Sequence, residues 1–325
     1  MTGIREIGGY FPLEVARSGA FHPRAKAFLT ARGALKQLLL SLFETGRGPK
    51  RLWLPTFLCP DIETAISEIA PSLQIIRYAV NDVLQPVGCD PKSTDLAYYY
   101  NVFGLTGALA RLLPPKSVWD NAHGFFSPPA PGCTTLYSAR KFFGVPDGAY
   151  LYSTEPVVVP PPLSDVRRSL HLLKRHDQGA QAAFSDFRAA ETELAGAPPA
   201  GMSLLTRRIL EGIDYSAVSV LRLTNLVTLH EVLGRQNELG TLIDAALSDP
   251  HFVPFSYPLL IADGAALRER LISKKVFIPL LWSGVVSRPE ITGFERHLAL
   301  DTVHLPIDQR YGEFEMIEVL TRAGF

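Results

Sequence analysis

The sequence predicts an α/β protein with a mostly parallel sheet between helices, followed by a small C-terminal α+β domain. Two observations support this fold class. Strand-like and helix-like segments alternate between residues 29 and 153, a pattern typical of parallel sheets with helices on both faces. After Pro250 the pattern changes to strand, helix, strand, helix over shorter segments. We therefore predict a large domain over residues 1–240, with a loop-like N-terminal arm, and a small domain over residues 241–325.

Composition limits the functional classes that fit. The chain has 325 residues, of which 47% are hydrophobic and 20% charged, as in globular proteins with a large core. Its 32 basic and 32 acidic residues leave no surplus charge to bind nucleic acid or an anionic membrane. No apolar signal segment or membrane-spanning run occurs, and Cys59, Cys89 and Cys133 suit neither a disulfide framework nor a metal site. We expect a cytoplasmic protein without a bound metal.

The first half of the chain supplies the predicted sheet. Thr30 is placed as a helix N-cap, and the apolar residues that follow recur with helical spacing: Leu35, Leu38, Leu39 and Leu42. Strands are expected over residues 51–55, 74–80 and 95–103, and helices over 60–70 and 107–113. This alternation predicts a mostly parallel sheet with helices on both faces.

The second half of the chain is more helical. Residues 164–193 are polar and charged with helical propensity, and one long helix is expected from about 214 to 247, ended by Pro250. The C-terminal segments are expected as strands over 255–262 and 276–281 and as helices over 265–272 and 312–322.

The most informative stretch covers residues 116–153. A short apolar strand ends in Asp120, and a turn containing His123 follows it. A second strand, residues 134–138, ends at Ser138 and leads to Lys141, and a turn at 146–148 precedes a third strand. Because an open α/β sheet presents its chemistry at the carboxyl ends of its strands, we expect Asp120 and Lys141 to lie together.

A lysine and a carboxylate at one sheet edge suit pyridoxal phosphate chemistry. The lysine holds the cofactor as a Schiff base, and the carboxylate keeps the pyridine nitrogen protonated. Simpler interpretations exist: Lys141 as a surface lysine beside Arg140, Asp120 as a turn cap, and His123 as a structural histidine. Phe142 and Phe143 favour the reactive interpretation, because an apolar setting lowers the pKa of a lysine. No glycine-rich phosphate loop, metal cluster or Ser-His-Asp set competes.

These motifs resemble the DegT/StrS-type sugar aminotransferases, a family of fold-type I pyridoxal phosphate-dependent enzymes. The resemblance rests on the Asp120-Asn-Ala-His123 strand end, on Lys141 after a later strand, and on the Asp147-Gly148-Ala149 turn beyond it. It covers most of the chain and is architectural after residue 153. It implies a large cofactor-binding domain, a small C-terminal domain and pyridoxal 5′-phosphate as cofactor.

The resemblance also implies a role for each site residue. Asp120 would meet the pyridine nitrogen, Lys141 would carry the cofactor, and His123 would stack on the ring or hydrogen bond its 3′-oxygen. The phosphate would lie at the helix N-terminus formed by Thr30, Ala31 and Arg32, near Ser138, which resembles a Ser-x-x-Lys ligand. Thr30 could equally be a plain helix cap.

Two further positions follow from the family pattern. Cys59 occupies the place of the residue that stacks on the ring, and Phe57 could turn in instead or belong to the core. The family also has members with a phosphate-binding serine five residues before the lysine, where this chain has Leu136.

As a function, the resemblance implies transfer of an amino group from an amino acid such as glutamate to a nucleotide-linked keto sugar, as in polysaccharide biosynthesis. It implies small-molecule substrates and a homodimer. Two alternatives stay open. A dehydratase-like member is one, although those dehydratases replace the lysine by histidine, whereas Lys141 is present here. A non-catalytic binding protein is the other, because the C-terminal domain is short for the family.

Overall fold

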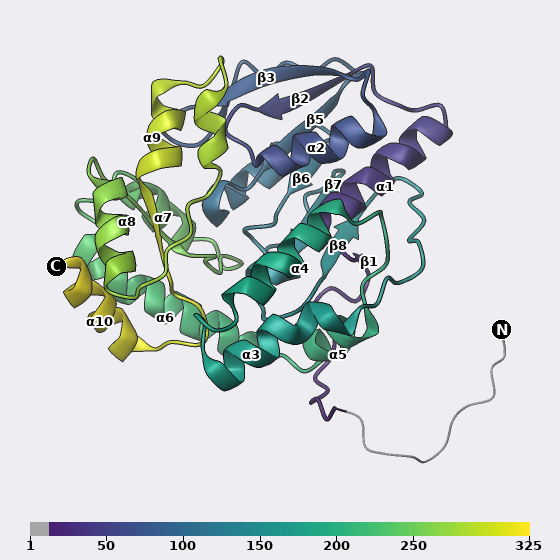
Figure 1. The fold of residues 1–325 in the computed structure, drawn as a ribbon. Coiled ribbons are helices and arrows are strands. Elements are labelled where there is room, and N and C mark those ends of the chain that lie inside the picture. The colour runs from purple at the N-terminus through teal and green to yellow at the C-terminus, as the bar shows by residue number, and fades with distance from the viewer. Residues whose placement is uncertain (1–12) are drawn as a thin grey trace, which may run out of the picture.

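The computed structural model describes residues 13–325 and contains a mostly parallel sheet, as predicted, which has eight strands (Figure 1). The strands are β1 (Lys26–Phe28), β2 (Arg51–Pro55), β3 (Gln74–Val80), β4 (Pro86–Val87), β5 (Leu96–Tyr100), β6 (Val118–Asp120), β7 (Thr134–Ser138) and β8 (Ala149–Tyr152). Their order is β1-β8-β7-β6-β5-β2-β3-β4, and the pairs from β7 to β3 are parallel. The first part of the expected N-terminal arm, residues 1–12, lies outside the described residues.

Helix α1 (Ala31–Glu44) shows how the sequence places an element on the sheet. The Thr30 hydroxyl accepts a hydrogen bond from the Gly33 N–H at 2.9 Å, so Thr30 is the N-cap that the sequence predicts. The leucine stripe of α1 is buried against the sheet and against α2 (Pro60–Ile69). Each buried leucine contributes about 1.5–3 kcal/mol through removal of apolar surface from water. This packing fixes the first turn of α1 beside the end of β7 and the start of β8.

The opposite face of the sheet has a separate aromatic core. Tyr99 and Trp119 are buried there with Cys133, and Leu109 from the short helix η2 (Gly107–Arg111) packs against them. Neighbouring residues of one strand therefore serve different faces: Tyr98 and Tyr100 belong to the α1 side and Tyr99 to this one. Both faces of the sheet are covered, as the fold class requires.

The connecting region is helical and includes one error of prediction. Its elements are η4 (Val166–Ser169), α3 (Leu170–Gln178), α4 (Phe184–Gly196), α5 (Leu204–Glu211), α6 (Tyr215–Leu233) and α7 (Gly240–Leu247). The single helix expected over residues 214–247 is wrong, because the chain turns between Gly234 and Gly240. Asn237 holds that turn: its side chain donates to the Pro258 carbonyl and accepts from the Leu260 N–H. Apolar periodicity continues across the turn, so the pattern alone did not indicate it.

The C-terminal region consists of β9 (Tyr257–Leu260) paired antiparallel with β10 (Thr302–Leu305), and of helices α8 (Gly264–Ser273), α9 (Gly293–Asp301) and α10 (Glu313–Ala323). A strand was expected over residues 276–281, and this is wrong. Val276 and Ile278 alternate inward with an exposed Phe277, but Pro279 lacks an N–H and the segment joins no sheet. The strand that pairs with β9 is β10, directly after α9.

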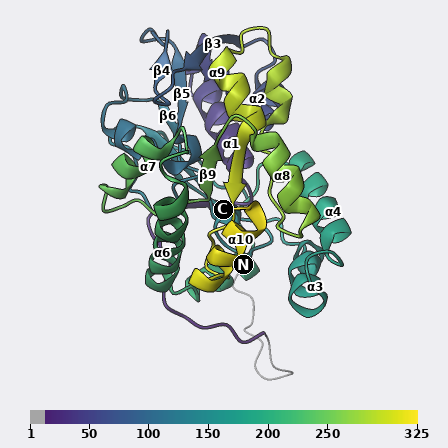
Figure 2. The same ribbon diagram turned by 90° about the vertical axis from the view of Figure 1, so that its left-hand side faces the viewer.

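Helix α10 packs beside α6, as both ribbon views show (Figures 1 and 2). Residues from both sides of the expected boundary at 240 and 241 therefore belong to one hydrophobic cluster. The boundary itself stays a prediction. Within residues 13–325, no helix combines the length and the apolar character needed to cross a membrane.

Candidate active site

A cavity of about 290 Å³ lies at the carboxyl ends of the parallel strands. Its lining includes every site residue named from the sequence except Phe57: Thr30, Ala31, Arg32, Cys59, Asp120, His123, Ser138 and Lys141. Parallel pairing explains the convergence, because β6 and β7 end at the same edge and α1 begins beside it.

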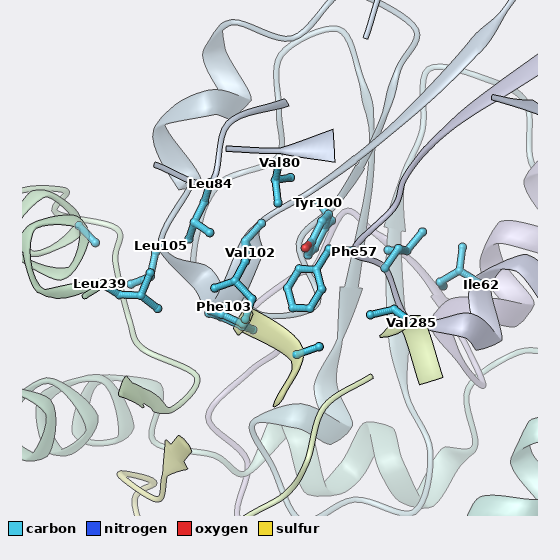
Figure 3. Packing of buried hydrophobic residues seen from close by; sticks show 14 of the residues in the cluster. Phe57, Ile62, Val80, Leu84, Tyr100, Val102, Phe103, Leu105, Leu239 and Val285 are labelled. Atoms are coloured by element: carbon cyan, nitrogen blue, oxygen red, sulfur yellow. The ribbon is translucent and has the colours of Figure 1, made fainter. Parts of the chain in front are cut away.

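Phe57 belongs to the core. Its side chain is 0% exposed and packs edge-to-face against Phe103 and Trp282. Figure 3 shows it among the buried side chains of this cluster, with Val285 nearby from the C-terminal region. Of the two interpretations of Phe57, the structure matches the structural one, and Cys59 is the residue from this turn that lines the cavity.

Asp120 is held by two donors. The Tyr98 hydroxyl donates to Asp120 Oδ2 at 2.7 Å, and the Ala122 N–H donates to Oδ1 at 2.9 Å. Burial raises the pKa of the Asp120 carboxyl, whereas these two hydrogen bonds and the nearby charge of Lys141 act to lower it. The Asp120 carboxylate is therefore already oriented to bind a cationic group in the cavity.

Lys141 ends the short helix η3 (Ala139–Lys141), which follows β7 directly. Its Nζ lies 5.5 Å from the centre of the Phe255 ring. Burial lowers the pKa of the Lys141 amine, and Cys59 and Asp120 oppose this effect. The neutral, nucleophilic form of the amine is thus more accessible than for a surface lysine.

His123 lies in an aromatic stack that the sequence did not predict. Its ring is parallel to Phe255 at 4.5 Å and to Trp282 at 5.5 Å, with interplanar angles of 6° and 7°. Burial lowers the pKa of His123 well below its usual value, so the imidazole is neutral at pH 7. Its buried Nδ1 has no hydrogen-bond partner within residues 13–325. Such an atom is expected to have a polar partner when the site is complete.

Another part of the cavity lies at the N-terminus of α1. The first turn of α1 brings backbone N–H groups and the positive end of a helix dipole, and Arg32 of this turn pairs with Asp61, which also lines the cavity. Ser138 and Arg140 line the cavity as well, and Arg140 pairs with Glu191 of α4. The buried Nε of Arg140 has no partner in the described chain. This part of the cavity therefore suits an anion such as a phosphate group.

The Asp147-Gly148 turn has a structural task. Gly148 has φ +123°, and a Cβ there would lie 2.9 Å from Thr206 Cγ2. Its N–H donates to the Leu29 carbonyl at 2.7 Å, and Asp147 Oδ1 accepts from the Ser203 N–H at 3.1 Å. The turn thus ties β8 to the segment just before α1.

Sequence reasoning missed several lining residues, chiefly Tyr100, Asn101, Arg140, Glu191 and Trp282. Arg140 precedes Lys141 and Asn101 follows β5, so their places at strand ends could have indicated them. Trp282 and Glu191 come from distant segments and have no such local signal.

A second cavity, of about 1110 Å³, meets the first at Arg140, Lys141 and Phe187. Residues of α3, α4 and α8, with the segments at 275–277 and 308–310, form its walls. Its charged lining is mostly basic: Arg140, Lys141, Arg175, Arg222, Lys275 and Arg310, with Asp308. Its aromatic lining consists of Phe142, Phe143, Phe184, Phe187 and Phe277.

Comparison with solved structures identifies the fold. A DegT/DnrJ/EryC1/StrS aminotransferase from Brucella abortus is similar with a TM-score of 0.57 and 13% identity over 92% of this chain and 84% of that one. The sugar aminotransferase CalS13 from Micromonospora echinospora gives 0.56 and 16%, covering 93% and 88%. A GDP-4-keto-6-deoxymannose-3-dehydratase with a trapped PLP-glutamate geminal diamine gives 0.58 and 12%, covering 92% and 88%. The chain has the fold of fold-type I pyridoxal phosphate-dependent enzymes.

The sequence of this chain matches no protein-family model and no curated protein. The resemblance stated from the sequence is therefore confirmed by structure as a resemblance of fold.

The residues present fit pyridoxal phosphate. The cavity offers an oriented carboxylate at Asp120 and an amine at Lys141, and the N-terminus of α1 supplies the positive end of a helix dipole. The unpartnered polar atoms of His123 and Arg140 match the ring oxygen and the phosphate that this cofactor carries. Residues 13–325 contain no group of His, Cys, Asp or Glu side chains that could hold a metal ion.

Proposed function

We propose that this chain is a pyridoxal phosphate-dependent aminotransferase of the DegT/StrS type. The observation that carries the proposal is the single cavity that unites Asp120, Lys141 and the N-terminus of α1. If Lys141 were only a surface lysine and Asp120 only a turn cap, nothing would require both to line one cavity. The fold supports the same function, since Asp120 and Lys141 come from neighbouring parallel strand ends.

Each residue has a distinct task in this proposal. Bound pyridoxal phosphate would supply the electron-withdrawing ring that acidifies the α-carbon of the amino donor. Lys141 would hold the cofactor through its aldehyde and, once released, would move the proton at the donor α-carbon. Asp120 would accept a hydrogen bond from the protonated ring nitrogen. His123 would partner the ring oxygen.

The phosphate would bind where the N-terminus of α1 lines the cavity. The backbone N–H groups at Ala31 and Arg32 and the Ser138 hydroxyl would donate to it. Arg140, which now pairs with Glu191, would add a charged donor. Thr30 would serve mainly as the N-cap, and Cys59 would lie against the ring.

The larger cavity would hold the second substrate. Its volume of about 1110 Å³, its cationic side chains and its aromatic rings suit a nucleotide-linked keto sugar, which carries a base and a diphosphate. An amino acid such as glutamate would be the donor. We further propose a cytoplasmic homodimer that serves polysaccharide biosynthesis. The presence of Lys141 favours amino transfer over the dehydratase-like alternative.

Borohydride trapping tests the proposal directly. Protein saturated with pyridoxal phosphate is reduced with borohydride, digested and mapped by mass spectrometry. We expect one major adduct, on Lys141, and none at that peptide in Lys141→Ala. An adduct mainly on another lysine, or no adduct, would contradict the proposal. If the adduct forms but no amino donor from a broad panel changes the cofactor spectrum, the protein is a binding protein on this fold.

A further inference from the structure

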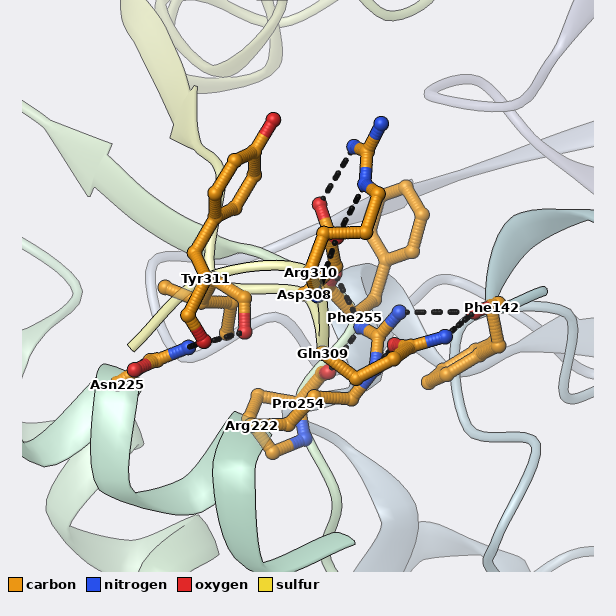
Figure 4. A network of polar contacts seen from close by, with 10 residues as sticks. Phe142, Arg222, Asn225, Pro254, Phe255, Asp308, Gln309, Arg310 and Tyr311 are labelled. Atoms are coloured by element: carbon orange, nitrogen blue, oxygen red, sulfur yellow. Dashed lines mark hydrogen bonds and ion pairs between the residues drawn. The ribbon is translucent and has the colours of Figure 1, made fainter. Parts of the chain in front are cut away.

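Arg222 on α6 is a buried cation that joins three segments of the chain (Figure 4). Its side chain is part of the core, since the residue is 1% exposed. Its Nε donates to Gln309 Oε1 at 2.9 Å, and its Nη1 donates to the carbonyls of Pro254 and Phe255 at 3.0 and 3.1 Å. Its Nη2 donates to the Phe142 carbonyl at 3.0 Å. All three nitrogens of the guanidinium therefore have partners.

Such a residue is costly to keep. Burial of a cation disfavours folding unless its donors are satisfied, and here neutral oxygens satisfy them instead of a carboxylate. Burial lowers the pKa of Arg222 to about 10, so the side chain remains charged at neutral pH. The nearby Asp308 pairs with Arg310. The unfavourable burial of this cation indicates that Arg222 has a role that an apolar residue could not perform.

The contacts of Arg222 converge on the surroundings of Lys141. Phe142 follows Lys141 in the chain, and its carbonyl accepts both from Arg222 and from Gln309 Nε2, the latter at 2.8 Å. Phe255, whose carbonyl also accepts from Arg222, places its ring 5.5 Å from Lys141 Nζ. The same ring stacks on His123. One guanidinium thus fixes the backbone beside the lysine and the aromatic wall that faces it.

We propose that Arg222, with Gln309 as its relay, is a positioning residue that keeps the Lys141 amine in its buried place against Phe255. The inference rests on the proposed role of Lys141 but concerns the placement of this amine, which can be measured without cofactor. Arg222 contacts no reacting atom and acts through Phe142 and Phe255. Without it, the lysine would reach solvent more easily and would lose part of the environment that favours its neutral form.

Several titratable groups surround this amine, and the variants used in the test leave all of them unchanged. They are Arg32 on α1, Cys59 before α2, Asp120 on β6, His123 after β6, Arg140 beside the lysine and His304 on β10. Gln309 carries no charge, and Arg222→Lys keeps a cation at its position. A change at either residue therefore reports on position.

The test is competitive labelling of the cofactor-free full chain with trace acetic anhydride across pH, quantified at the Lys141 peptide. In the wild type we expect a titration midpoint below that of an ordinary lysine. In Arg222→Lys and in Gln309→Leu we expect the midpoint to rise by about 0.5–1 pH unit. The neutral fraction of Lys141 at pH 7 would then fall about 3- to 10-fold.

Asn225 provides a matched control. It is buried on the same helix and donates to the carbonyls of Ile307 and Tyr311, in the segment that carries Gln309 (Figure 4). Asn225→Ala should lower thermal stability without moving the Lys141 midpoint. The proposal is overturned if Arg222→Lys and Gln309→Leu leave the midpoint unchanged, or if Asn225→Ala shifts it as much.

If Arg222→Lys does not fold, Gln309→Leu decides by the same criterion, because it keeps the buried cation. The result is independent of cofactor binding. An adduct on a different lysine in the trapping experiment would refute the proposed function, while an unmoved midpoint here would refute only the role of Arg222.

Discussion

The two cavities that meet at Lys141 are built in different ways. The smaller one takes its chemistry from strand ends, where the β6–β7 register pairs Asp120 with Leu136 and so fixes the aspartate beside the strand that leads to Lys141. The larger one is lined by separate helices and loops, and much of its charge comes from long side chains such as Arg175 and Lys275. A sheet edge holds reacting groups rigidly, whereas helix surfaces and loops can vary with the substrate.

This difference predicts which positions tolerate substitution and which do not. In the smaller cavity each carboxylate oxygen of Asp120 has its own donor, and the buried His123 Nδ1 has no partner within residues 13–325. Loss of one such group should disturb one step strongly. In the larger cavity several cations would act together on the proposed anionic ligand, so each single loss should be modest. The following predictions test this comparison, from the largest expected effect to the smallest.

Asp120→Asn should have the largest effect. The substitution keeps the size of the side chain and removes the charge that would hold the ring proton. We expect donor α-proton removal to slow by about 10³-fold, a loss of roughly 4 kcal/mol in the transition state, while substrate affinity changes much less. Donor-dependent spectral change of the bound cofactor, followed by stopped flow, measures it. Equal rates in the two proteins would show that Asp120 does not act on the ring.

Ser138→Ala should weaken cofactor binding by about 1.5–3 kcal/mol, the range for a hydrogen bond to a charged group. The measurement is the dissociation constant of pyridoxal phosphate compared with that of pyridoxal, which lacks the phosphate. Only the phosphorylated form should lose affinity. If both forms weaken equally, or neither does, Ser138 lies outside the phosphate site.

The sequence could predict the smaller cavity because its determinants are local. Asp120 and Lys141 follow short apolar strands, and Thr30 is a cap that begins an amphipathic helix. The fold class followed from the same alternation of elements. These signals lie within a few residues of the groups that they place.

The sequence could not predict what depends on tertiary contact. Phe255 and Trp282 enclose His123 from segments more than a hundred residues away, and neither carries a local motif. Trp282 even adopts a left-handed conformation, φ 57°, which no propensity would suggest. The β10 strand and the turn after α6 were missed for the same reason, since long-range pairing through Asn237 and β9 decides them.

A pH-dependent loss of stability should come from His304 on β10, a buried residue whose ring packs edge-to-face against Phe103. Burial lowers the pKa of His304 to about 3, from 6.5 in an unfolded chain. The unfolded state therefore binds the extra proton, and stability falls as pH drops below 6.5. At pH 5 the His304 contribution is a loss of about 2 kcal/mol. Urea unfolding at pH 7 and 5 should show a smaller difference in His304→Gln than in wild type.

The comparison residue for this experiment is His176, which lines the larger cavity and is exposed. His176→Gln should keep the wild-type difference between the two pH values. If both variants behave alike, the burial of His304 does not contribute to the pH dependence of folding.

The smallest effect is expected in the larger cavity, where neighbouring lysines offer a matched pair. Lys275 lines the cavity, whereas the Lys274 Nζ donates to the Arg322 carbonyl at 2.7 Å and does not line it. Lys275→Gln removes one of several cations that would face the proposed diphosphate, so KM for the keto-sugar acceptor should rise about 5-fold, near 1 kcal/mol, with kcat nearly unchanged. Because exposed charges are screened by salt, the difference should shrink at high ionic strength. Lys274→Gln should leave KM at the wild-type value, and equal effects from the two lysines would show that the larger cavity does not bind the acceptor.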